Sequence, residues 1–117
     1  MKNLIIIFVL FISTIVSAQS ILVAGTQVDC GTWISARKNN TSSHYEHYLL
    51  GLLNGLALGR GVEVWQRKNT STTVTTVQFY YWMDAYCQKN PLEGVMPGSL
   101  AFANEMSNGD FNKAYKK

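Results

Sequence analysis

The sequence predicts an all-α fold, a small four-helix domain that one disulfide holds together. Apolar residues recur at the spacing of one helix face, most regularly at Tyr45, Tyr48, Leu49, Leu52, Leu53 and Leu56. No segment alternates convincingly between apolar and polar residues, as a half-buried strand would. The two cysteines, Cys30 and Cys87, lie in different predicted helices. These three observations indicate helices packed around a single core.

Residues 1–18 have the features of a secretory signal peptide. Lys2 gives a basic start, an apolar run extends from Leu4 to Val16, and small residues lead to Ala18. The apolar run is shorter than the roughly 20 residues that a membrane-spanning helix needs. We therefore expect cleavage after Ala18, export of the mature chain and no stable membrane insertion afterwards, with an uncleaved anchor as the alternative.

A single helical domain is expected over residues 19–117, with its core over about 28–106 and a flexible C-terminal tail. An exported chain meets an oxidising compartment, where an even number of cysteines favours a disulfide. A bond between Cys30 and Cys87 would join the first predicted helix to the third. Closing so long a loop stabilises a fold by roughly 4 kcal/mol.

The first two helices are expected over residues 28–37 and 43–66. The second is apolar nearly all round, which predicts a central position in the domain. Gly59 and Gly61 are points at which this helix could bend or end before residue 66.

The third helix is expected over residues 75–89. Gln78 follows Thr75 by three positions, which is the spacing of a capping box. The β-branched residues within 72–77 also suit a strand, so this segment has two interpretations. The fourth helix is expected to start at Leu92 or Pro97 and to end at Met106, with residues 111–117 as a frayed tail.

Gly51, Gly55 and Gly59 are spaced by four, so they share one side of the second helix. Polar residues interrupt the apolar stretch around them, which argues against a membrane dimer of the Gly-x-x-x-Gly type. Each glycine costs a helix up to about 1 kcal/mol relative to alanine. We therefore expect a helix-packing groove that receives the aromatic third helix.

No metal or cofactor is expected. His44 and His47 are three positions apart, whereas a helical zinc pair is usually four apart, and the chain has no third histidine. The glycines and Arg60 lie within or at the end of a helix, where outward carbonyls disfavour a phosphate. No nucleophile elbow or paired carboxylates are evident, so the sequence indicates a non-enzymatic protein.

A nucleic-acid partner is also not expected. The chain carries ten Lys or Arg and seven Asp or Glu, and the basic residues are scattered. A nucleic-acid binder would concentrate them on one face, interleaved with aromatic residues. The charge distribution therefore points to another class of partner.

The candidate partner-binding residues are Trp65, Trp82, Asp84 and Tyr86. Tryptophan and tyrosine are enriched among the residues that anchor protein interfaces. Asp84, within an aromatic segment, has two interpretations: it accepts hydrogen bonds from a tyrosine or from backbone, or it contacts a partner.

Three stretches resemble small exported bacterial helical proteins: CGTW at residues 30–33, YLLGLLNG at 48–55 and YWMDAYCQKNPL at 81–92. The chain is similar over 28–106 to the periplasmic acid-stress chaperones of the HdeA type and the immunity proteins of the Rap1a/Tai type. In both groups one disulfide ties an early helix to the helix before an Asn-Pro-like or similar turn. The resemblance implies a periplasmic protein that acts by binding another protein, an effector or a client.

The content of charged residues distinguishes between these two groups of proteins. Acid chaperones of this type are rich in charged residues, whereas charged residues make up 15% of this chain, with seven carboxylates. Acid-triggered loosening needs carboxylates to protonate. The sequence therefore favours an immunity protein over a stress chaperone, and it leaves the oligomeric state open, with a homodimer as one option.

Overall fold

A computed structural model of the chain describes residues 28–114 and confirms the all-α class. The predicted signal peptide, residues 1–18, lies outside the described residues. Two isolated β-bridges are the only extended pairings within residues 28–114. That segment forms five helices: α1 (Cys30–Lys38), α2 (Ser43–Arg60), α3 (Thr76–Lys89), α4 (Val95–Met106) and α5 (Asp110–Ala114).

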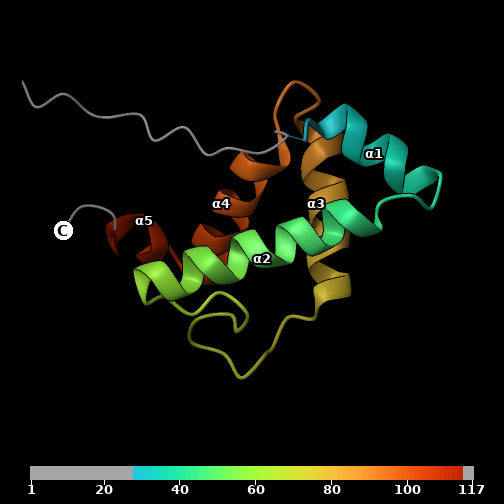
Figure 1. Cartoon of the computed structure of the whole chain (residues 1–117). Coiled ribbons are helices and arrows are strands. Elements are labelled where there is room, and N and C mark those ends of the chain that lie inside the picture. Colours follow the sequence, from blue (N-terminus) through green and yellow to red (C-terminus); the bar gives the residue numbers. More distant parts are fainter. Residues whose placement is uncertain (1–27, 115–117) are drawn as a thin grey trace, which may run out of the picture.

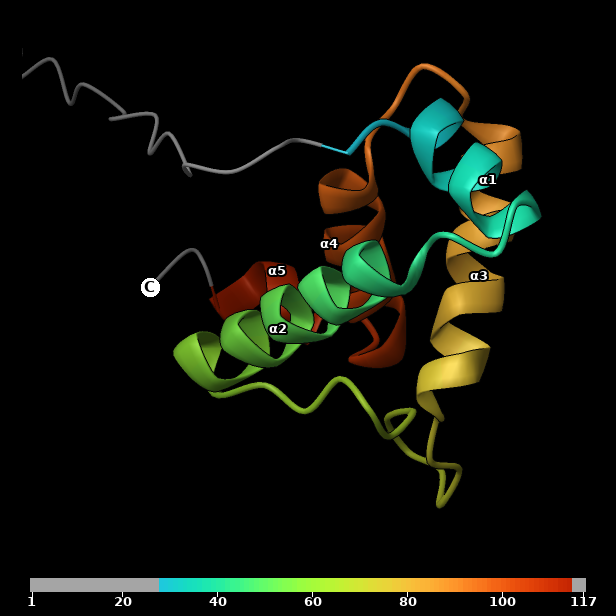
Figure 2. The ribbon, with the colours of Figure 1, turned by 45° about the vertical axis from the view of Figure 1, so that its right-hand side comes forward.

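The helices form two pairs that meet in the middle of the molecule. Helix α1 packs on α3, α2 packs on α4, and α3 and α4 pack on one another (Figure 1). Helix α5 lies beside the end of α2 and packs on α4, as Figure 2 also shows. The predicted disulfide between Cys30 and Cys87 is confirmed, and it fastens the start of α1 to the last turn of α3.

Asp29 starts α1. Its carboxylate accepts hydrogen bonds from the Thr32 backbone N–H at 2.7 Å and from the Thr32 hydroxyl at 3.1 Å. An aspartate in this position satisfies a backbone donor that has no partner within the helix. The preceding residue, Val28, accepts a hydrogen bond from the Val95 N–H, which joins the starts of α1 and α4.

Acidification is expected to weaken this cap. The hydrogen bonds from Thr32 lower the pKa of Asp29 below its ordinary value of 3.8. The unfolded chain therefore binds the proton first, so the contribution to stability is present above pH 3.8 and is lost as the pH falls below it. In Asp29→Asn the amide caps without titrating. Between about pH 5 and about pH 2, the melting temperature of this variant should fall less than that of the wild type. An equal fall in both proteins would contradict the role of Asp29 as the cap.

Helix α2 is shorter than predicted, because it ends at Arg60 and not at residue 66. Gly61 follows in the left-handed conformation, with φ of 63°, and its N–H returns to carbonyls of the last turn. Glycine adopts this conformation without a steric penalty, which makes it a common helix terminator. Val64 then lies buried in the following loop.

The predicted capping box at the start of α3 is confirmed. The Thr75 hydroxyl accepts from the Gln78 backbone N–H at 3.2 Å, and the Gln78 side chain accepts from the Thr75 N–H at 2.8 Å. The ambiguous segment 72–77 is divided: Thr73 pairs in an isolated β-bridge with Gln66, and the helix begins at Thr76.

The end of the chain corrects the expected frayed tail. Helix α4 begins at Val95, between the two predicted starts, and ends at Met106 as expected. Residues 110–114 form α5, in which Phe111 is 0% exposed. The Phe111 N–H donates to the hydroxyl of Ser107 at 2.9 Å. Burial of one large aromatic ring stabilises this short helix, so the core extends past residue 106.

The predicted glycine groove on α2 is wrong. Gly51, Gly55 and Gly59 are exposed, and a Cβ atom added at any of them would meet no neighbouring atom within 4 Å. Helix α2 packs through its other side, where Leu49 and Leu53 are buried. The spacing established that the glycines share a face, but it did not establish which face packs.

Gly98 of α4 provides the close helix contact instead. A Cβ atom there would lie 2.7 Å from Sδ of Met83 and 2.9 Å from Cδ1 of Tyr86, both on α3. Met83 is completely buried, so its side chain has little room to move. Gly98 therefore allows α3 and α4 to approach one another.

Alanine at Gly98 and at Gly55 should change stability in opposite directions. Overpacking at Gly98 costs about 1–3 kcal/mol and the better helix propensity of alanine returns about 1 kcal/mol, so Gly98→Ala should destabilise the fold by about 1 kcal/mol. Gly55→Ala meets no neighbour and should stabilise by up to about 1 kcal/mol. Urea unfolding measures both; shifts of the same sign would contradict this assignment.

Candidate protein-binding surface

Two of the predicted partner-binding residues lie together on α3. The rings of Trp82 and Tyr86 stack with centroids 5.5 Å apart and an interplanar angle of 12°. They are one helical turn apart, which places them on the same side of α3. Trp82 also meets Phe102 of α4 edge-on at 5.3 Å, so the core supports the stack from below. Both rings are partly exposed, and they offer a rigid aromatic surface.

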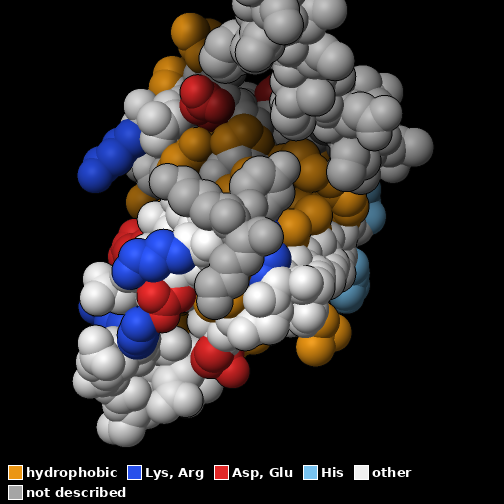
Figure 3. Space-filling view, turned by 90° about the vertical axis from the view of Figure 1, so that its left-hand side faces the viewer, with side chains coloured by type: hydrophobic (Ala, Val, Ile, Leu, Met, Phe, Trp, Pro, Cys, Tyr) orange, Lys and Arg blue, Asp and Glu red, His pale blue; other side chains and the backbone are white. Residues whose placement is uncertain are grey.

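A carboxylate on α4 extends this surface. Glu105 accepts a hydrogen bond from Nε1 of Trp82 at 3.1 Å, and its other oxygen lies 3.6 Å from Nη2 of Arg67. Arg67 comes from the loop between α2 and α3, so three parts of the chain meet here. On the face shown in Figure 3, blue and red side chains alternate instead of forming a region of one sign. That face therefore shows no large region of one charge sign (Figure 3).

The turn between α3 and α4 continues the surface beyond Tyr86. In Figures 1 and 2 this turn projects past the ends of the two helices it joins. Leu92 at the turn is 100% exposed. Burial raises the pKa of Tyr86, and the negative charge of nearby Glu93 raises it further, so the phenol stays protonated and able to donate. The sequence pattern allowed Leu92 to begin a helix, so it did not predict that this side chain would be fully exposed in a turn.

Trp65 lies at a different place, beside the end of α2. Its Nε1 donates to Oδ1 of Asn54 at 2.7 Å, and its ring packs edge-on against Phe79 at 5.8 Å. With exposed Leu58 it borders an open cleft of about 490 Å³. Trp65 therefore remains partly accessible, but it does not join the Trp82–Tyr86 stack.

The carboxylate of Asp84 is hydrogen-bonded to other residues of the same chain. It accepts from Nε1 of Trp33 at 2.7 Å and from Arg37, whose Nε and Nη2 each lie 3.1 Å from a carboxylate oxygen. The donors are a tryptophan and an arginine of α1, in place of the tyrosine or backbone donor that was considered. Residues two positions apart on a helix face different ways, so Asp84 points away from Trp82 and Tyr86.

Arg37 connects α1 to α2 as well. Its Nη1 donates to Oε1 of Glu46 at 2.8 Å, and the Ser42 hydroxyl donates to the same oxygen at 2.7 Å. The two carboxylates raise the pKa of Arg37, so its charge persists at any pH at which the protein is folded. One arginine thus bridges three helices through ionic hydrogen bonds.

The two histidines lie on the exposed side of α2. The ring of His44 lies 3.7 Å from that of Tyr45, and His47 is exposed. Within residues 28–114 no cluster of three or more His, Cys, Asp or Glu side chains is arranged to hold a metal ion. In the same part of the chain, no helix has both the length and the apolar character needed to cross a membrane.

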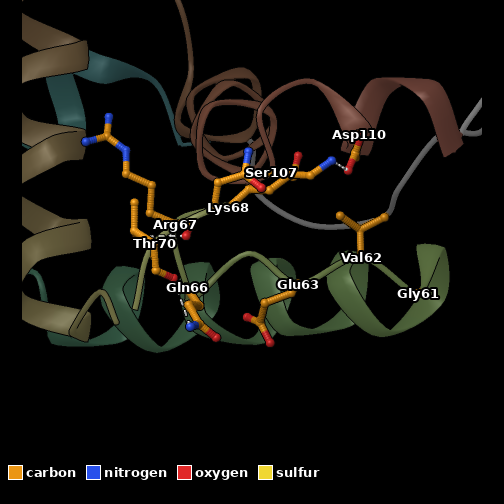
Figure 4. A pocket seen from close by; sticks show the side chains of 10 residues that line it. Gly61, Val62, Glu63, Gln66, Arg67, Lys68, Thr70, Ser107 and Asp110 are labelled. Atoms are coloured by element: carbon orange, nitrogen blue, oxygen red, sulfur yellow. Dashed lines mark hydrogen bonds and ion pairs between the residues drawn. The ribbon is translucent and has the colours of Figure 1, made fainter. Parts of the chain in front are cut away.

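A pocket of about 420 Å³ opens between the loop after α2 and the start of α5 (Figure 4). Lys68 and Asp110 point toward one another and form an ion pair, whereas Arg67 extends in the other direction. The pairing of Lys68 lowers the pKa of Asp110. Glu63 and Arg67 also line the pocket, so its four charged side chains comprise two of each sign.

Four features are thus contributed by α3, α4 and the connections at their ends: the Trp82–Tyr86 stack, Glu105, Arg67 and the turn that carries Leu92. We call this region the α3–α4 edge. Comparison of the chain with protein-family models, with curated proteins and with solved structures finds no match.

Proposed function

We propose that the protein is an exported, non-enzymatic binding domain that recognises another protein through the α3–α4 edge. The observation that carries the proposal is the stacked Trp82–Tyr86 pair, which remains partly accessible on α3. Large aromatic side chains that are already held in place contribute contact area at a low entropic cost. The edge therefore has the residue types and the rigidity of an interface anchor.

The partner we propose is a secreted effector, which the protein would bind and neutralise in the periplasm, as an immunity protein of the Rap1a/Tai type does. The disulfide between Cys30 and Cys87 is compatible with an oxidising compartment. It fastens α1 to α3, the helix that carries both aromatic rings, so it also supports the binding surface.

The test begins with a search of the genes beside this one for a secreted toxin, which then serves as the binding probe. We expect the purified full-length mature protein to bind it tightly by isothermal titration calorimetry, and co-export of the two to relieve the growth defect that the effector alone causes. Tyr86→Ala should weaken binding, while Gly55→Ala, on the exposed side of α2, should bind as the wild type does. Absence of both binding and protection would overturn the proposal.

A second candidate function, a periplasmic stress chaperone, is favoured by the three-helix bridge of Arg37. Arg37 joins α1 to α2 and α3 through two ion pairs, so loss of these pairs would loosen the contacts between the three helices. This function predicts that acid exposes apolar surface and that the protein then suppresses aggregation of unfolded clients. A dye-binding titration from about pH 7 to about pH 2 separates the two, since an unchanged folded monomer contradicts the chaperone.

A further inference from the structure

Helix α5 is the shortest of the five helices that the structure describes within residues 28–114. It packs on α4 and lies beside the end of α2 (Figures 1 and 2). With five residues it is much shorter than a helix that is stable in water by itself. Its order therefore depends on its contacts with the rest of the molecule.

The link between α4 and α5 has the backbone geometry of a hinge. Asn108 and Gly109 are consecutive, and both have positive φ angles, of 50° and 87°. They change the direction of the chain after α4, and the Asp110 N–H then donates to the Ser107 carbonyl at 3.2 Å. Asparagine and glycine adopt this left-handed region more readily than other residues. Rotation at these two residues is enough to move α5 away from α4.

One buried ring attaches α5 to the core. Phe111 is the only buried residue of this helix. The guanidinium of Arg60 lies over its ring, with Cζ 3.9 Å from the ring centroid, and Nη1 of Arg60 donates to its carbonyl at 3.2 Å. The Phe111 N–H donates to the Ser107 hydroxyl, which in turn donates to the Ala103 carbonyl at 2.8 Å. The position of α5 therefore depends mainly on this one side chain.

An ion pair connects α5 to the loop between α2 and α3. Asp110 pairs with Lys68, and the two side chains point toward one another in Figure 4. The loop is also held by the Lys68 backbone N–H, which donates to the Met106 carbonyl at 2.9 Å. The adjacent Arg67 lies 3.6 Å from Glu105, a carboxylate of the α3–α4 edge. A chain of contacts thus runs from α5 through the loop to that edge.

The ion pair by itself contributes little to the attachment of α5. The side chains of Lys68 and Asp110 are 42% and 37% exposed, and water screens the attraction between charges at such positions. Helices α1–α4, by contrast, share the main core, and the disulfide joins two of them. A segment that one side chain attaches opens more often than the core, which opens only when several helices separate.

We propose that α5 is a strap that opens and closes as a unit about Asn108 and Gly109 while α1–α4 stay folded. In the closed state Phe111 fills its place in the core cluster, and Asp110 holds the loop through Lys68. In the open state Phe111 leaves this cluster, apolar surface at the end of α4 becomes accessible, and the loop loses its attachment to α5. The strap is a conformational device of the fold itself, so the inference does not depend on the proposed function.

Hydrogen exchange of the full mature protein, followed by NMR, tests the strap. In the wild type the amides of Phe111 and Lys113 should exchange at least about 100-fold faster than those of Met83 and Cys87 in α3, because only the strap has to open. Phe111→Ala should remove the remaining protection of α5, because loss of a buried ring favours opening by at least about 100-fold. The Lys68 amide should then exchange about two- to fivefold faster, since the ion pair no longer holds it, and α3 should be unchanged.

A second variant tests the hinge without removing a core side chain. A Cβ atom at Gly109 would meet no neighbour within 4 Å, so Gly109→Ala acts through the positive φ alone. It should speed exchange of the α5 amides by about 5- to 30-fold. Lys113→Ala is the matched control, because its side chain is 76% exposed and lies 3.5 Å from Asp110; it should change that rate by less than about threefold.

The outcome depends on which amides exchange together. Equal exchange rates for α5 and α3 in the wild type would overturn the strap, because α5 would then open only when the whole domain unfolds. A Phe111→Ala variant whose α3 amides are accelerated as much as those of α5 would overturn it as well. Faster exchange in α5 with an unchanged Lys68 amide would overturn the connection between the strap and the loop.

Discussion

Replacement of both Cys30 and Cys87 by alanine is expected to lower the free energy of unfolding by about 4 kcal/mol. The two residues are 57 positions apart, so the disulfide removes a large amount of conformational freedom from the unfolded chain. Both sulfur atoms lie in the core, where the residues are 1% and 2% exposed. For a domain with a total stability of about 5–15 kcal/mol, the loss amounts to between about a quarter and most of that stability.

Urea denaturation of the double variant measures this effect, and wild-type protein reduced by dithiothreitol provides the matched control. The two samples share the open chain but differ in side-chain packing, so their midpoints should fall close together and well below that of the oxidised protein. An oxidised and a reduced protein with the same midpoint would contradict the disulfide's role. The reduced sample should also lose effector binding if α3 needs α1 to hold the α3–α4 edge in place.

Asp84→Ala is expected to destabilise the fold by about 3 kcal/mol. The substitution removes the acceptor for Nε1 of Trp33, whose side chain is completely buried. It also leaves Arg37, three quarters buried, with Glu46 as the remaining partner in its ionic network. Unpaired polar groups in such a position lose water without gaining a partner, which is the costly half of a hydrogen bond.

Asp84→Asn is the matched control, since its amide oxygen can still accept from Trp33 while the charge is lost. Its destabilisation should be about half that of Asp84→Ala. Guanidinium unfolding and the fluorescence of the buried Trp33 monitor both variants. Equal stability of Asp84→Ala and the wild type would mean that the three-helix bridge contributes nothing measurable, as many exposed ion pairs do.

Different residues of α3 therefore stabilise the fold and form the proposed binding surface. Tyr80, Met83 and Cys87 face the core, and Asp84 ties the helix to α1. Trp82 and Tyr86 are half-buried and pack against α4 at the α3–α4 edge, where part of each ring remains accessible. A variant of Asp84 should consequently change stability more than affinity for a partner. This division lets folding and binding be measured independently.

Much of the fold follows from local rules that the sequence carries by itself. Thr75 and Gln78 predict the start of α3 because a capping box involves residues only three apart. The cysteines predict the link between α1 and α3 because an exported pair of thiols has one intramolecular partner each. The all-α class follows in the same way from the periodicity of the apolar residues.

Local rules did not predict features that depend on which helices pack against one another. Three glycines on α2 and one on α4 have the same intrinsic properties, yet only Gly98 lies against another helix. Phe111 appears in a polar segment, but the core has room for its ring, and burial then organises α5. Asp84 sits among aromatic residues in the sequence, and its partner Arg37 is 47 positions away.

The sequence by itself determined the helical class, the disulfide, the capping box and two of the residues that form the α3–α4 edge, because each depends on spacing or on residue chemistry. Only the tertiary structure decided that α2 presents its glycines to solvent, that Asp84 turns inward and that Leu92 is fully exposed in a turn. The physical reason is that exposure is a property of the packed molecule: the same side chain is core or surface depending on which neighbours the fold brings against it.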